Sequence, residues 1–243
     1  DDGIAEGQLV IAVNDNIFEA TSGGFDTVSM VGTGPIYNGT IITSMADNTV
    51  VGNNVSGGMY YNSVTFDADA DLTNGYDKVA GGTTTIGDAA NNVIGDGAAF
   101  YNVDGNLSYD VFDVDNSGGD GLLVKNTASN DFTLETLGGN ILTQGGAAIN
   151  IDPLTVNITL DSATSTGSDK AGIILDGLAA GSTLDIGTTT ITNSTDEGIF
   201  VNDAANTTLE FGDTTINSPG ETDIRIQNSA GADIIYNTTT LNG

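Results

Sequence analysis

The chain has 243 residues, of which 33 are acidic and 4 are basic, so its formal net charge is −29. Nucleic acids and anionic membrane surfaces bind through clustered Lys and Arg, and this composition excludes both as partners. Cysteine and histidine are absent, which excludes disulfides, thiolate metal sites and His-dependent catalysis, and no apolar segment is long enough to cross a bilayer as a helix.

The first part of the chain lacks the regular spacing that appears later. Short apolar runs such as residues 9–13 occur here, but they do not recur at a fixed interval. We therefore expect residues 1–57 to form an irregular N-terminal cap or an assembly segment.

From residue 58 onward a short motif recurs, in which two apolar positions flank one residue and Asn or Asp usually follows. It reads GMYYN, AAFYN, GLLVK, AINID, GIILD, GIFVN and DIRIQ, starting at Gly58, Ala98, Gly121, Ala148, Gly172, Gly198 and Asp223. The first apolar positions from the second motif on are evenly spaced: Ala99, Leu122, Ile149, Ile173, Ile199 and Ile224. The longer interval from Met59 to Ala99 breaks the series, so we expect an irregular insertion near residues 67–96.

The last repeats superimpose at a fixed period. The aligned apolar columns are Leu184, Leu209 and Ile234; Ile186, Phe211 and Tyr236; and Ile191, Ile216 and Leu241. Each run alternates apolar and polar residues, as in a strand with one buried face, and Gly, Asn and Asp separate the runs. Residues 58–243 are therefore predicted to be an all-β parallel β-helix with about 25 residues and three strands per coil, and we expect it to be right-handed.

The first strand of each repeat predicts a hydrophobic surface. If Met59 and Tyr61 point inward, the residue between them in each repeat points outward. Five of these outward residues are large and apolar: Tyr60, Phe100, Leu123, Ile174 and Phe200. Stacked coil on coil they would form an apolar stripe, which is typical of a contact surface. The stripe is expected either to contact another molecule or to be covered by the chain's own N-terminal segment.

The run DVDNSGGD is a candidate Ca²⁺ site. It places carboxylates at Asp113, Asp115 and Asp120 around a Gly-Gly turn, and Ca²⁺ prefers such oxygen ligands. The run departs from an EF-hand loop because Ser117 replaces an acidic ligand and no Glu follows at the twelfth position. A plain Asp/Gly turn is the alternative.

Two further patterns point to other functions. Asp185 and Glu210 are one repeat period apart, so they would stack about 5 Å apart on neighbouring coils, as the carboxylates of a retaining glycosidase do. Thr190 and Thr192 flank an inward Ile, as in solenoids that order water on a flat Thr face, but the second Thr is replaced by Asn217 in the next repeat. For both patterns, an ordinary solvated polar face is the alternative that fits better.

The repeats GLLVK, GIILD and GIFVN and the stretch TTLEFGDTTIN resemble right-handed parallel β-helix surface proteins, the class that includes autotransporter passengers and large bacterial adhesins. The resemblance covers about residues 98–243; it concerns the architecture and transfers no catalytic residue. It makes us expect a secreted, non-enzymatic cell-surface protein, a self-assembling filament, stalk or adhesin subunit. Its partners would be other copies, head to tail or lateral, or surface glycans. The alternative is a carbohydrate-binding or carbohydrate-active β-helix protein, either a lyase or a hydrolase.

Overall fold

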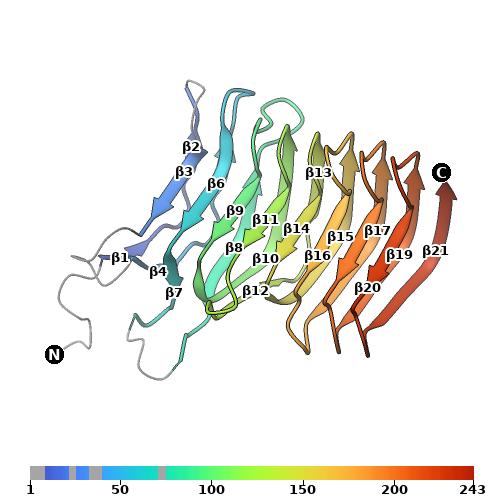
Figure 1. Ribbon diagram of the computed structural model, residues 1–243. Coiled ribbons are helices and arrows are strands. Elements are labelled where there is room, and N and C mark those ends of the chain that lie inside the picture. The colour runs from blue at the N-terminus through green and yellow to red at the C-terminus, as the bar shows by residue number, and fades with distance from the viewer. Residues whose placement is uncertain (1–8, 22–25, 33–39, 71–74) are drawn as a thin grey trace.

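A computed structural model describes residues 9–21, 26–32, 40–70 and 75–243, and within these ranges every regular element is a β-strand. The strands pair in parallel and stack along one axis, from β1 at one end to β21 at the other (Figure 1). The chain is therefore a parallel β-solenoid of about eight coils of about 26 residues, which confirms the predicted fold class. None of the described residues forms a helix of the length and apolarity needed to cross a membrane.

One side of the solenoid is an eight-stranded sheet that takes one strand from each coil. In chain order its strands are β3 (Asp26–Val31), β6 (Gly57–Asn62), β9 (Ala98–Tyr101), β11 (Leu122–Lys125), β14 (Ile149–Asp152), β16 (Ile173–Asp176), β18 (Ile199–Asn202) and β20 (Ile224–Gln227). Their register has no bulge from β9 to β20.

The other two sides belong to a thirteen-stranded sheet. Its strands are β1 (Leu9–Ala12), β2 (Ile17–Glu19), β4 (Thr40–Ser44), β5 (Thr49–Val51), β7 (Val64–Phe66), β8 (Val79–Ile86), β10 (Asp104–Ser117), β12 (Phe132–Thr136), β13 (Asn140–Gln144), β15 (Thr155–Thr166), β17 (Thr183–Thr192), β19 (Thr208–Asn217) and β21 (Asp233–Asn242). β12 and β13 are separate, but both pair with β15, which continues round the corner between the two sides. Each coil thus has three sides, and in the last coils one long strand forms two of them.

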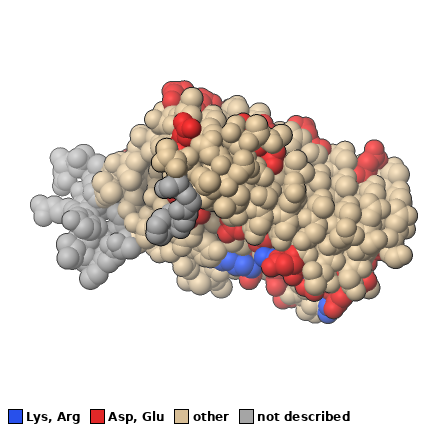
Figure 2. All heavy atoms as spheres, turned by 90° about the horizontal axis from the view of Figure 1, so that it is seen from above, with Lys and Arg blue, Asp and Glu red and all other residues tan. Residues whose placement is uncertain are grey.

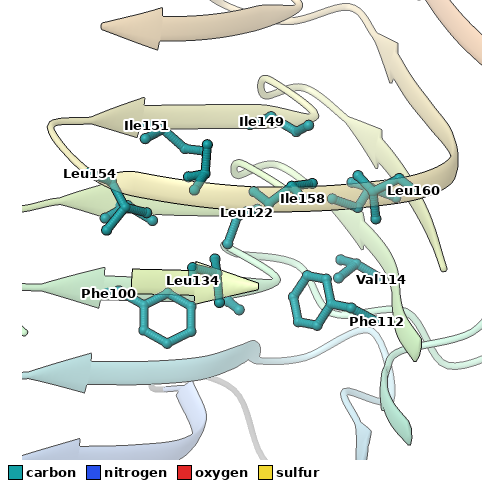
Figure 3. Close-up of a cluster of buried hydrophobic side chains, with 14 of the residues drawn as sticks. Phe100, Phe112, Val114, Leu122, Leu134, Ile149, Ile151, Leu154, Ile158 and Leu160 are labelled. Atoms are coloured by element: carbon teal, nitrogen blue, oxygen red, sulfur yellow. The ribbon is translucent and has the colours of Figure 1, made fainter. Parts of the chain in front are cut away.

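The inward side chains of successive coils stack into columns that form one continuous core. One such column contains Ile149, Ile173 and Ile199, all with 0% exposure. Figure 3 shows Ile149 and Ile151 of β14 facing Ile158 and Leu160 of β15 across the interior, with Leu154 at the turn between the two strands. Period-2 alternation on all three sides directs these aliphatic side chains to the same interior.

The core of the earlier coils is aromatic. Phe100 lies 5.0 Å from Tyr61, 5.6 Å from Phe132 and 6.2 Å from Phe66, measured between ring centroids. All four rings are almost completely buried. Aromatic pairs in this distance range add to the stability that burial of their apolar area provides.

The glycine that begins the repeated motif allows neighbouring coils to approach closely. A β-carbon on Gly121 would lie 2.7 Å from the carbonyl oxygen of Ala148 in the next coil, and one on Gly198 would lie 2.5 Å from that of Asp223. Both distances are shorter than van der Waals contact, so a larger residue would push the coils apart. This explains why a small residue recurs before the first inward apolar residue.

The described strands before residue 58 pair with the coils that follow them. β3 pairs in parallel with β6, β1 with β4, and β4 with β7. The change in sequence pattern near residue 57 is therefore not matched by a change in strand direction. What changes is coil length, because the partners Val28 and Met59 are further apart along the chain than the partners Ile199 and Ile224.

The predicted insertion near residues 67–96 contains a strand of the solenoid. β8 lies within it and pairs in parallel with β10 and β5. The partners Met59 and Ala98 are further apart along the chain than any other successive pair in this column, so this is the longest coil of the eight-stranded sheet. Residues 71–74 of the insertion lie outside the described ranges.

Candidate functional site

The predicted apolar stripe is wrong at one position. β9 pairs Ala98 with Met59 and Phe100 with Tyr61, so Ala99 is the outward residue of this coil. Phe100 has 0% exposure and packs in the aromatic core. The motif AAFYN fits the alternation in either of two registers, and the register that buries the large ring is the one that forms.

The other four stripe residues do share the outer face of the eight-stranded sheet. Leu123 is the partner of Ala99, and Ile174 is the partner of Phe200. Leu123 is only 6% exposed, and Tyr60, Ile174 and Phe200 are half-buried. Asn150 separates Leu123 from Ile174 in this column. The outward apolar column is thus discontinuous, and its large members are half-buried except Leu123, which is buried.

Three of the four basic residues of the chain lie on this outer face, where they pair with carboxylates and an amide. Lys170 contacts Asp120, whose side chain is only 2% exposed, at 3.1 Å. Asp120 also accepts from the Asn150 side chain at 2.7 Å, and Lys125 donates to the Asn150 oxygen at 3.2 Å. Burial would lower the pKa of Lys170, but Asp120 outweighs it and raises this pKa above its usual value.

A second ion pair lies near the C-terminal end of the same face. Arg225 donates to the buried carboxylate of Glu197 at 2.9 Å, and its guanidinium lies 5.5 Å above the Phe200 ring. Figure 2 shows basic atoms next to acidic ones, with other acidic atoms along the margins of the molecule. Lys170 and Arg225 therefore each neutralise a buried carboxylate within the fold.

Acidic groups with perturbed pKa values gather at the N-terminal part of this face. Burial raises the pKa of Asp96, although the backbone N–H of Asp120 donates to its carboxylate at 2.8 Å. Burial also raises the pKa of Asp26. Burial and the negative charge of Asp96 raise the pKa of Tyr101 to about 12, and the Tyr101 ring lies 5.3 Å from that of Tyr60.

The structure does not bring the three candidate Ca²⁺ ligands together. Asp113 accepts from the backbone and side chain of Asn140 at 2.9 and 3.1 Å. Asp115 follows on the same strand, whereas Asp120 lies beyond the corner and binds Lys170. Across the described ranges no group of three or more acidic side chains is arranged to hold a metal ion. The run from Asp113 to Asp120 is the end of strand β10 followed by a solenoid corner.

The two patterns on the other sides are present as registers. Asp185 and Glu210 are partners on β17 and β19, and Glu210 accepts from Asn237 at 3.3 Å. The outward Thr column spans four coils, with the members Thr164, Thr190, Thr215 and Thr240. Both sets lie on solvated strand faces.

The C-terminal end of the solenoid exposes residues that belong to the core columns. Ile226 is 46% exposed and Leu241 is 47% exposed, while their partners in the preceding coil, Val201 and Ile216, are both 0% exposed. β20 and β21 form the edges of the two sheets at this end (Figure 1). Among the described residues, β20 and β21 are therefore the last strands of their sheets, and exposed core-column side chains lie beside them.

No protein-family model, curated protein or solved structure matches the chain significantly.

Proposed function

We propose that the protein is a structural β-solenoid of a cell surface, a secreted filament, stalk or adhesin rod that extends by end-to-end addition of parallel coils. The proposed partner is another copy of the chain. The observation that supports this most is the exposed cross-section formed by β20 and β21.

The exposed surface of β20 and β21 would be more stable against a further coil than against solvent. Ile226 and Leu241 present aliphatic side chains that are 46% and 47% exposed, so completing their burial would gain about 1 kcal/mol each. The Tyr236 ring stacks on Phe211 at 5.0 Å, and its hydroxyl is buried without a hydrogen-bond partner. The edges of β20 and β21 offer backbone donors and acceptors in the geometry that a parallel strand would use.

The opposite end of the eight-stranded sheet has complementary columns. β3 is its other edge strand, and the registers place Val28 in the column of Ile224 and Met30 in that of Ile226. Placing β3 of one copy beside β20 of the next continues both columns with apolar side chains. Because such a contact joins two different surfaces without closing a ring, it generates a filament.

Sedimentation velocity over a range of protein concentrations tests this proposal. We expect the unmodified chain to form polymers, and the double variant Ile226→Asp, Leu241→Asp to sediment as a monomer. The matched control is Ile235→Asp, on the same strand as Leu241 but with an outward side chain that is 37% exposed. A monomeric unmodified chain, or a double variant that still polymerises, would refute end-to-end assembly.

A further inference from the structure

A groove lies on the side of the solenoid, where the connections between two sheets differ in length. Residues 126–131 join β11 to β12, and residues 177–182 join β16 to β17. The coil between them has only Pro153 and Leu154 at this position, between β14 and β15. Because these three coils are consecutive, the short connection lies lower than its two neighbours. The result is a groove of about 240 Å³.

The floor of the groove is apolar and open. Pro153, Leu154 and Ala179 contribute to it, and Leu154 also reaches into the core. Gly177 keeps the floor clear, since a β-carbon there would lie 2.9 Å from Cβ of Pro153. The Ala179 N–H donates to the Leu154 carbonyl at 3.0 Å, which fixes one wall against the floor.

The other wall is held in place by its own hydrogen bonds. The side chain of Asn130 accepts from the backbone and hydroxyl of Thr127 at 3.1 and 2.9 Å, which closes the turn. Asn126 both donates to and accepts from the backbone of Val103 in the preceding coil. This wall is therefore formed before any ligand arrives, so binding would not require ordering of the loop.

The polar groups of the groove suit a neutral polyol. Asp131 is the one charged side chain among the described residues that line it, and Thr127 and Thr155 add hydroxyls to the lining. With no cation in the lining, an anionic ligand is disfavoured, and one exposed carboxylate gives a cationic ligand little affinity. A carboxylate can accept from two neighbouring hydroxyls of a sugar, while the carbon face of the ring packs on proline.

The volume favours a single ring. It lies below the range of about 300–1,000 Å³ that is typical of sites for drug-sized ligands. We propose that this groove, between the 126–131 and 177–182 connections, binds one neutral sugar unit, such as the end of a surface glycan. This goes beyond the proposed structural role: it assigns the rod a lateral ligand site, which is independent of its ends.

Saturation-transfer NMR with the methyl glycosides of glucose, galactose, mannose and N-acetylglucosamine tests the site. At least one of them is expected to bind with millimolar affinity. Ala179→Phe fills the groove and should weaken that binding at least tenfold, and Thr155→Val, which removes only the Thr155 hydroxyl, should weaken it several-fold. The matched control is Ala180→Phe, since residue 180 is exposed and next in sequence but does not line the groove.

Four outcomes would overturn the assignment: no binding of any of the four glycosides, full binding by Ala179→Phe, full binding by Thr155→Val, or an equal loss in Ala179→Phe and Ala180→Phe. Thermal melting of each variant establishes that it is folded. Failure here would leave end-to-end assembly untouched, because the groove lies on the side of the rod and the assembly variants lie at its end.

Discussion

The assignment of Phe100 to the core gives a quantitative prediction. Phe100 is fully buried, and three aromatic rings lie within 6.2 Å of it between centroids. Truncation of a buried Phe to Ala costs about 3–5 kcal/mol, through lost transfer energy and the cavity left behind. In a domain of this size each kcal/mol lowers the melting temperature by about 2–4 °C. Phe100→Ala should therefore melt about 6–20 °C below the unmodified chain.

The matched variant is Phe200→Ala, because sequence alternation places both residues in the outward stripe. Phe200 lies half-buried on the outer face, with the Arg225 guanidinium above its ring. Its truncation should cost about 1 kcal/mol and lower the melting temperature by less than about 4 °C. Thermal unfolding followed by far-ultraviolet circular dichroism measures both. Equal shifts for the two variants, or a shift below about 3 °C for Phe100→Ala, would refute the register assigned to β9.

Three further predictions concern charge. Lys170→Met should lower the free energy of unfolding in urea by about 1–2 kcal/mol, because it leaves the charge of the buried Asp120 without its cation. The control Lys78→Met should cost less than about 0.5 kcal/mol, because the Lys78 side chain is 60% exposed. Equal losses of unfolding free energy in the two variants would contradict a role of Lys170 in neutralising Asp120. Lowering the pH from 7 should raise the melting temperature, because a carboxyl whose pKa is raised in the folded state binds its proton at a higher pH there than in the unfolded chain. This gain should be complete once the pH is below the ordinary carboxyl pKa of about 4. A lower melting temperature at pH 5 than at pH 7 would contradict the prediction. The groups concerned are Asp26, Asp96 and Asp115. Raising NaCl to about 1 M should also raise the melting temperature, because salt screens the repulsion within a chain of net charge −29, and an unchanged temperature would contradict that account.

The regular coils could be predicted from the sequence because their registers are repeated without bulges. Leu184, Leu209 and Ile234 align at the repeat period in the sequence and are partners in the structure. Where connections vary in length, this alignment is lost, so β3 and β8 did not stand out as coil strands. Alternation alone does not place Phe100, because it fits AAFYN in two ways, and the volume available inside the coil selects one of them.

The candidate sites depended on geometry that the sequence pattern does not contain. Asp113 and Asp120 are close along the chain, but the corner between them turns their side chains to different sides of the solenoid. The lateral groove arises from three neighbouring coils with connections of different lengths. The sequence contains the signal for this groove in the unequal lengths of three connections, 126–131, 153–154 and 177–182. That signal can be interpreted only when the three coils are known to be adjacent.

Negative-stain electron microscopy of the purified chain tests end-to-end assembly most directly. About eight coils at about 4.8 Å per coil make a rod roughly 40 Å long. End-to-end assembly predicts unbranched fibres one solenoid wide with this axial repeat, which disappear in the Ile226→Asp, Leu241→Asp variant. Isolated rods of that length at every concentration would contradict it.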